Sequence, residues 1–399
     1  MAFSSEQLRE LERLDGLREQ MIEWRRYLHQ HPELSFHESE TAQYVEQRLR
    51  QLGVETLRGF AGNAVIGRIV GAEPGPTVAL RADMDALPIQ DDKEGCAYRS
   101  LVPGVMHACG HDAHTATLLG LAHWFVGRRD RLNGTVLLLF QHAEEQCPGG
   151  AVDVVQSGAL DAADVIYGVH LWSQSPVGHV YCAPGPLMAA ADKFSIVIKG
   201  KGGHAGMPHE AVDSIVVGAH TVVALQSIVS RFTPPEAPAV LTVGAMQAGS
   251  TFNVIASECR LQGTVRTFDE ATRERIRAML ENIVQQTAAM FGAKAELDYE
   301  SGYPAVVNDE LEASRFFEAA ADIMPESCVH RSPIIMAAED FSYYLLQKPG
   351  CYMFVGAGNA DKGIVYPHHH PKFDVDEDAM VHSARLLAAM TLHYMNERA

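Results

Sequence analysis

Two hydrophobic patterns alternate along the first half of the chain. Segments with apolar residues at helical spacing cover residues 38–53 and 114–129. Short apolar, β-branched runs that suit buried strands cover residues 63–71, 77–88, 134–145 and 164–172. Strands and helices in this order predict an α/β domain with a mixed, mostly parallel sheet.

The pattern changes near residue 187. Alternating strands are expected at 193–199, 238–250 and 258–268, and long helices at 210–232 and 270–292. We expect two helices and a four-stranded sheet, which includes these three strands, to form a compact α+β unit of about 110 residues, an ordinary domain size. From residue 303 the α/β pattern returns. We therefore expect a discontinuous domain over 1–186 and 303–399, interrupted by a smaller inserted domain over 187–302.

Composition and charge narrow the possible partners and compartment. The formal net charge of −18 argues against a nucleic-acid or anionic-membrane footprint. Seven cysteines, odd in number and widely scattered, argue against a disulfide framework and favour a reducing compartment. Residues 1–24 read as a charged amphipathic helix without a signal peptide, and no run approaches a membrane span. We expect a cytoplasmic protein.

Four polar clusters lie just past predicted strands or in loops. In open α/β sheets the ligand crevice lies beyond the carboxyl ends of the strands, so clusters distant in sequence can converge there. Each cluster alone also fits a solvated turn or a hydrogen-bonded core residue. The clusters are Asp83 with Asp85, Cys109 with His111, Glu144 with Glu145, and His170.

One of these clusters is unusually dense in metal-binding side chains. Residues 106–114 read MHACGHDAH, which offers thiol, carboxylate and imidazole groups that first-row transition metals prefer. Asp112 and His114 fit structural support, and His107 stays undecided. A thiolate nucleophile at Cys109 with His111 as its base is an alternative, although two-residue spacing would need unusual geometry. The run His368–His370 fits a surface turn or a metal ligand equally well.

Two other motifs are incomplete or missing. The stretch GKGGHAGMPH lacks the Lys-Ser/Thr ending of a phosphate loop, which argues against a nucleotide site. No G-x-S-x-G elbow occurs in the sequence, which argues against a serine hydrolase of the α/β type.

Nine motifs together resemble the amidohydrolase branch of the aminoacylase-type dinuclear metallopeptidases. That branch includes hippurate hydrolases, N-acyl-amino-acid deacylases and indole-acetyl-amino-acid hydrolases. The resemblance covers about residues 20 to 395. Its motifs occur in the family's order and read HPELSFHE, RADMDALPI, MHACGHDAH, QHAEE, GVHLW, GKGGHAGMPH, NVIASECRLQGTVRTF, AAEDFSYYL and HHHPKFDVDE.

The resemblance implies a role for each motif. It implies two divalent metal ions per subunit, zinc, cobalt, nickel or manganese, held by Cys109, His111, Glu145, His170 and His369. Glu144 falls on the general base, and Asp85 falls on a residue that supports a metal ligand. His204 matches a histidine of the small domain that reaches the substrate carbonyl, often across a dimer interface. Asn253 and Arg266 match positions that hold the substrate carboxylate.

The implied activity is hydrolysis of the amide bond of N-acyl amino acids, of N-acetyl or N-benzoyl type, by a water that the metals activate. The inserted domain would be the lid and the surface for a homodimer or homotetramer. Ala256 and Ala337 stand where the family usually has Pro and Gly, which bears on specificity. A dipeptidase or carboxypeptidase of the same family and a non-catalytic small-molecule binder are the alternatives.

Overall fold

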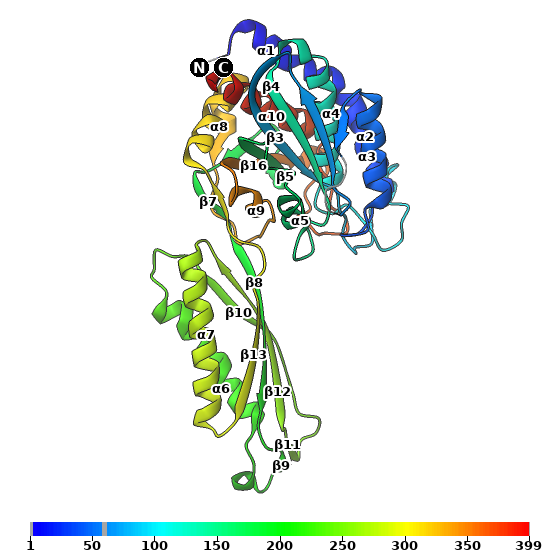
Figure 1. Cartoon of the computed structure of the whole chain (residues 1–399). Coiled ribbons are helices and arrows are strands. Elements are labelled where there is room, and N and C mark those ends of the chain that lie inside the picture. The colour runs from blue at the N-terminus through cyan, green and yellow to red at the C-terminus, as the bar shows by residue number, and fades with distance from the viewer. Residues whose placement is uncertain (1–2, 58–61, 399) are drawn as a thin grey trace. The chain divides into compact units, whose positions relative to one another are not determined.

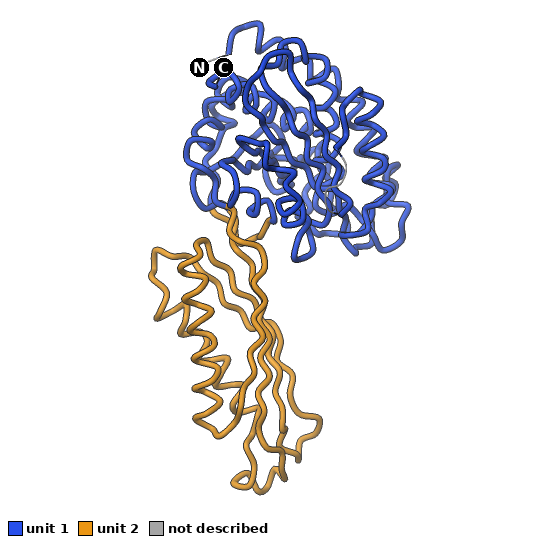
Figure 2. The backbone as a smooth tube through the Cα atoms, viewed as in Figure 1, with its two compact units in different colours: residues 1–187, 307–333, 340–399 blue, residues 188–306, 334–339 orange. Residues whose placement is uncertain are grey.

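The chain folds into two compact units. The computed structural model describes residues 3–57 and 62–398. Unit 1 contains residues 1–187, 307–333 and 340–399, and unit 2 contains residues 188–306 and 334–339 (Figure 2). The short segment 334–339 joins unit 2 through its backbone, because Ala189 N donates to the carbonyls of Ile335 at 3.1 Å and Ala337 at 3.0 Å.

Unit 1 is built on an eight-stranded mixed sheet with the strand order β1-β2-β4-β3-β5-β16-β6-β15 (Figure 1). The central strands β4, β3, β5 and β16 are mutually parallel, and β2 runs antiparallel to β4. The strands of unit 1 are β1 (Glu55–Leu57), β2 (Val65–Val70), β3 (Glu73–Asp83), β4 (Asn133–Gln141), β5 (Val165–Pro176), β6 (Val180–Cys182), β7 (Gly185–Met188), β14 (Val306–Asn308), β15 (Val329–Arg331) and β16 (Gly350–Gly358).

Two nearly fully buried helices, α4 and α10, pack on the central strands of this sheet. Helix α2 packs on α4, and a Cβ at Gly120 would lie 2.5 Å from the sulfur of Met21, so glycine allows this close approach. Helix α8 packs on α10. The helices of unit 1 are α1 (Ser5–Glu12), η1 (Arg13–Leu17), α2 (Arg18–Gln30), α3 (Ser39–Gln51), α4 (His111–Val126), η2 (Arg129–Arg131), α5 (Gly150–Gln156), α8 (Glu310–Ile323), η5 (Glu326–Cys328), α9 (Ser342–Leu345), η6 (Ala360–Lys362) and α10 (Asp378–Arg398).

Unit 2 is a four-stranded antiparallel sheet, β10-β12-β8-β13, with two long helices on one face (Figure 1). Asp213 and Asp269 cap these helices with carboxylates that accept from Ile215 N at 2.9 Å and Thr272 N at 2.8 Å. The elements are β8 (Ala190–Lys199), β9 (Gly203–His204), η3 (Pro208–Glu210), α6 (Ser214–Ser227), η4 (Ile228–Phe232), β10 (Val240–Ala248), β11 (Val254–Ile255), β12 (Glu258–Thr267), α7 (Glu270–Met290) and β13 (Lys294–Glu300).

The predicted α/β fold with a mostly parallel sheet and an additional small α+β sheet is confirmed. Two local expectations need correction. The single N-terminal helix is divided into α1, η1 and α2, with Gly16 in the 3-10 turn between them. The expectation that no run approaches a membrane span is wrong by length and composition, because Ser214–Phe232 has a mean hydropathy of 1.5. This stretch packs its buried side against α7 and β12, and only 28% of it is buried.

Candidate functional site

The polar clusters of unit 1 meet at the carboxyl ends of its parallel strands. Strand β3 ends at Asp83, which lies beside Gln141 at the end of β4. Helix α4 begins directly after Gly110, whose φ of +100° is a conformation that glycine adopts without strain. That turn places Cys109 before the helix and His111 in its first turn, so both side chains reach the strand ends.

Seven predicted site residues of unit 1 converge into one cluster. The donor atoms of Cys109, His111 and His170 all lie within 4.8 Å of one another. The donor atoms of Cys109, Glu145 and His369 also lie within 4.8 Å of one another and form a second triad. Cys109 belongs to both triads, and Glu144 lies with His111 and Glu145 in a third group. Asp85 contacts the first triad through its carboxylate, which lies beside Nδ1 of His111.

The histidines of the first triad are oriented as metal-binding histidines are. His111 Nδ1 lies 2.9 Å from the carbonyl of Asp85 and 3.1 Å from its carboxylate. His170 Nδ1 lies 2.8 Å from the carbonyl of Leu171, and its Nε2 lies 3.4 Å from the sulfur of Cys109. Among the described residues, no hydrogen-bond partner reaches the buried Nε2 of His111. In each ring one nitrogen is fixed by the protein and the other faces the cluster, which suits a bound cation.

The charge of the cluster also suits a cation. Burial disfavours the charged ring of His111, but the carboxylates of Asp83 and Asp85 outweigh it and raise the pKa of His111 to about 10. Burial, followed by the charges of Glu145 and Glu144, raises the pKa of the Cys109 thiol well above its usual range. A bound metal would supply the positive charge that a thiolate needs here. The donor set therefore fits the transition-metal ions that the sequence predicts.

The second triad depends on a loop before α10. His369 has a φ of +64°, and its backbone N donates to the carbonyl of Ala108 at 2.8 Å, beside Cys109. Its Nε2 lies 3.2 Å from Oε1 of Glu145, an interaction that raises the pKa of His369. His368 also approaches the cluster, with Nδ1 3.9 Å from the sulfur of Cys109, but its Nε2 accepts from Ser173 N at 3.3 Å.

The remaining histidines of the MHACGHDAH stretch have other surroundings. His114 uses both ring nitrogens, since Nδ1 lies 2.6 Å from Asp83 and Nε2 accepts from Leu171 N at 2.9 Å. Its bonds match structural support. His107 is buried, and burial lowers its pKa to about 4, so it stays neutral at physiological pH.

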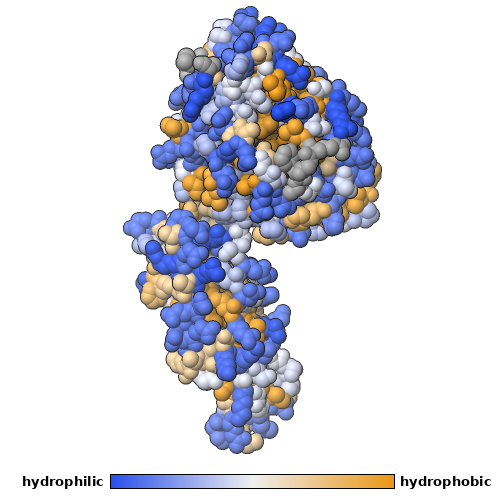
Figure 3. Space-filling model, viewed as in Figure 1, coloured by the Kyte–Doolittle hydropathy of each residue, from blue (hydrophilic) through white to orange (hydrophobic). Residues whose placement is uncertain are grey.

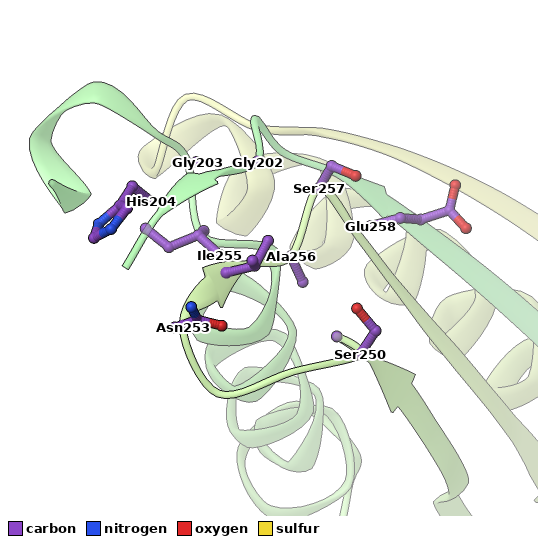
Figure 4. A pocket seen from close by; sticks show the side chains of 11 residues that line it. Gly202, Gly203, His204, Ser250, Asn253, Ile255, Ala256, Ser257 and Glu258 are labelled. Carbon is purple, nitrogen blue, oxygen red and sulfur yellow. The ribbon is translucent and has the colours of Figure 1, made fainter. Parts of the chain in front are cut away.

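The three candidate residues of unit 2 do not lie together. His204 and Asn253 line a cavity of about 600 Å³ at the β9–β11 end of the unit, as Figure 4 shows. Ala256 lines the same cavity. Arg266 lies opposite Ala191 and Val240, at the end of the sheet where the chain enters the unit. Arg266 lies eight residue steps along the extended strand from Glu258 of the cavity, which corresponds to roughly 25 Å.

Comparison with known proteins identifies the family. The family model described as Peptidase family M20/M25/M40 matches residues 79–393. The chain belongs to the M20/M25/M40 family. An N-acyl-L-amino acid amidohydrolase of Geobacillus stearothermophilus is 48% identical over 300 residues, covering 75% of this chain and 81% of that protein. Thermostable carboxypeptidase 1 of Saccharolobus solfataricus is 38% identical over 380 residues, covering 94% and 96%.

A solved structure of the same family supports the fold. YxeP of Bacillus subtilis, described as a dinuclear metal binding peptidase from the M20 family, has a TM-score of 0.83 at 34% identity, covering 96% of this chain and 99% of that one. The resemblance that the sequence motifs indicate is therefore confirmed, and so is the class of enzyme. The protein is a metal-dependent amidohydrolase of the M20/M25/M40 family.

The sequence alone indicated no role for several buried residues around the candidate metal ligands. Arg25 of α2 is fully buried and contacts Asp112, the residue after His111. Its position three and four residues from the buried Leu28 and Met21 places it on the apolar helix face, which is the signal that could have singled it out. Glu38 lies within the HPELSFHE motif, but nothing in its neighbours indicates that its carboxylate is buried.

Proposed function

We propose that this enzyme hydrolyses N-acyl amino acids of N-acetyl or N-benzoyl type to a carboxylate and a free amino acid. The observation that carries the proposal is the pair of donor triads that share Cys109, with Glu144 in contact range of the same cluster. A pair of donor sets with one common thiol suits two neighbouring cations, and an additional carboxylate beside them suits proton transfer.

Five residues would hold two divalent ions. They are Cys109, His111, His170, Glu145 and His369. A thiol and three imidazoles favour zinc, cobalt or nickel over magnesium, and manganese remains compatible with the carboxylate. When bound, such ions lower the pKa of water and polarise an amide carbonyl.

Glu144 would carry the proton during hydrolysis. It lies in the group with His111 and Glu145, and its side chain is buried next to the cluster. Its carboxylate would take a proton from the attacking water and return it to the departing nitrogen, so one group acts first as base and then as acid. Asp85 would hold His111 in the ring orientation that ligation requires, through the contact at 3.1 Å.

The residues of unit 2 suggest that one active site uses two copies of the chain. Arg266 and the pair His204 and Asn253 lie at opposite ends of β12, too far apart for one small substrate to touch all three. Arg266 would bind the substrate carboxylate with its planar guanidinium. His204 and Asn253 of a second copy would reach the carbonyl and the carboxylate from the other side, and losing such an oxyanion donor typically costs about 10²–10³ in rate.

The surface of unit 2 supports a homodimer, or a homotetramer built from it. Ile215, Val216 and Val223 of α6 are 41%, 42% and 72% exposed, and Phe252 is 96% exposed. Hydrophobic residues also reach the face of unit 2 that is visible in Figure 3. Apolar side chains gathered on one helix face mark protein–protein contacts more often than free surface.

The experiment is a substrate panel measured before and after metal removal. N-acetyl and N-benzoyl amino acids and a set of dipeptides are incubated with the enzyme as purified, after chelation, and after addition of zinc, cobalt or manganese. We expect hydrolysis of N-acyl amino acids that chelation abolishes and metal restores. Activity that withstands thorough chelation but not thiol alkylation would support a Cys109 nucleophile and contradict the proposal.

The second candidate is a dipeptidase or carboxypeptidase. A relative with 38% identity is named a thermostable carboxypeptidase, which favours this alternative. Ala256 lines the cavity of His204, so the departure from proline changes a wall of the proposed substrate site. Faster cleavage of dipeptides than of every N-acyl amino acid in the panel would select this activity. A cytoplasmic location would agree with the odd number and wide spacing of the seven cysteines.

A further inference from the structure

The turn after β4 allows two adjacent glutamate side chains to reach the same site. Glu144 and Glu145 are adjacent, and in an extended strand their side chains would point to opposite faces. Strand β4 ends at Gln141, and Ala143 has a φ of +51°. This left-handed turn is what brings both carboxylates to within 4.8 Å of His111. For a residue other than glycine this conformation is strained, and it persists only where the surroundings hold it.

Strained backbone is concentrated around the candidate site. Within residues 3–57 and 62–398, three non-glycine residues have positive φ: Phe36 at +67°, Ala143 at +51° and His369 at +64°. His369 is a proposed metal ligand and Ala143 precedes Glu144. Phe36 follows Ser35, whose hydroxyl donates to Asp85 at 2.7 Å. Such conformations persist only where neighbouring groups determine them, so each of them needs an anchor.

Glu38 is the anchor of the turn at Ala143. Its side chain is fully buried, and its Oε1 accepts from the backbone N–H groups of Ala143 at 2.7 Å and Phe36 at 3.0 Å. Its Oε2 accepts from the side-chain amide of Asn63 at 3.2 Å. One carboxylate therefore holds two of the three strained residues in place.

The rest of the turn is held by groups from two other segments, the residues after β3 and the start of α5. Glu145 N donates to Oδ2 of Asp85 at 2.9 Å, and Ser35 holds that same oxygen. The carbonyl of Ala143 accepts from Gly150 N at 3.0 Å. Glu38 thus supplies the bond to Ala143 N, and Asp85 supplies the bond two residues later.

We propose that Glu38 is a positioning residue for Glu144 and Glu145: it holds Ala143 in the left-handed conformation that directs both carboxylates toward the other candidate metal ligands. The inference rests on the proposed function for the roles of those two carboxylates. It assigns Glu38 no contact with the substrate. Its proposed effect on Glu144 and Glu145 passes through the backbone N–H of Ala143.

The test compares Glu38→Ala and Glu38→Gln with the control Glu33→Ala. Glu33 belongs to the same loop and also accepts two backbone N–H groups, Thr41 N at 2.7 Å and Glu40 N at 3.2 Å, but these belong to the start of α3. Glu38→Gln keeps an oxygen that can accept from Ala143, so it serves as the conservative variant.

Three readouts separate positioning from general stability. We expect Glu38→Ala to lower kcat by about 10–100-fold, the usual effect of losing a partner behind a ligand, with KM within about threefold. Glu38→Gln should retain most of kcat. Hydrogen exchange should rise in the peptide over residues 141–146 of Glu38→Ala, whereas Glu33→Ala should raise it only at residues 39–45. Cobalt titration should show weaker binding of one equivalent in Glu38→Ala.

A second substitution tests the route through Ala143. Glycine adopts positive φ without strain, so Ala143→Gly in the Glu38→Ala background should recover several-fold of the lost kcat. Absence of any recovery would overturn this route. Wild-type kcat together with unchanged exchange at residues 141–146 in Glu38→Ala would overturn the proposal itself. If the wild-type enzyme hydrolyses no N-acyl amino acid, the proposed function fails, while the exchange data still decide the role of Glu38.

Discussion

Replacing Arg25 with methionine should destabilise unit 1 strongly. The Arg25 side chain is 0% exposed and contacts three carboxylates, Asp112 at 2.8 Å, Asp374 at 2.6 Å and Glu377 at 3.3 Å. Asp112 follows the candidate ligand His111, and Asp374 lies in the segment after His369. The arginine thus joins the helix α4 start to the loop before α10.

The magnitude follows from the burial of the partners. The Asp112 side chain is 0% exposed. Without Arg25 it would keep its contact with the His29 ring, whose Nδ1 lies 2.8 Å from the Asp112 carboxylate. Removing one member of a buried ion pair leaves an uncompensated charge, which typically costs 3–5 kcal/mol. Since domains are stable by about 5–15 kcal/mol, this loss is a large part of the free energy of unfolding.

The assay is urea unfolding followed by tryptophan fluorescence. The chain has three tryptophans, Trp24, Trp124 and Trp172, and all of them belong to unit 1, so the signal reports on this unit. Arg26→Met is the matched control. Arg26 is adjacent, its side chain is 45% exposed, and it contacts Glu377 at 2.8 Å, so its loss should cost at most about 1 kcal/mol.

If Arg25→Met lowers the free energy of unfolding by less than about 1 kcal/mol, or by no more than Arg26→Met, the ion pairs of Arg25 with Asp112, Asp374 and Glu377 do not stabilise unit 1.

The ionisation of Asp374 can be checked separately by acid titration. Burial opposes ionisation of Asp374, but the charges of Arg25 and Lys93 outweigh it and lower the pKa of Asp374 to about 2 from 3.8. This contribution is present above pH 3.8 and is lost as the pH falls through about 2.

Three further outcomes follow from the site. Glu144→Gln should lower kcat by about 10²–10⁴ while cobalt still binds, as measured by turnover and metal titration; full activity would exclude Glu144 as the base. Cys109→Ser should weaken both metal equivalents and remove the thiolate-to-cobalt absorption band, because both triads contain this sulfur; two tight equivalents without the band would contradict a shared thiol. Val223→Asp should shift the molar mass in light scattering to that of a monomer with unchanged circular dichroism, and a monomeric wild type would refute the dimer.

Much of the architecture could be predicted because its causes are local. The periodicity of residues 39–51 produces α3, and the aspartates before α6 and α7 cap those helices within three residues of themselves. The family could also be predicted, because its motifs are short and ordered. The division of the N-terminal helix at Gly16 and the apolar, half-exposed α6 were not foreseen.

The residue order alone supplies a thiol, three imidazoles and paired carboxylates, with the carboxylates at the ends of predicted strands. Their convergence depends on the folded chain. The left-handed conformation of Ala143 lets the adjacent glutamates converge. The folded chain also buries Glu38 and Arg25, so that their side chains bond to segments far away in the sequence. Tertiary structure also places Arg266 and His204 at opposite ends of β12. Periodicity and capping act over a few residues, whereas burial and convergence depend on contacts between segments far apart in the chain.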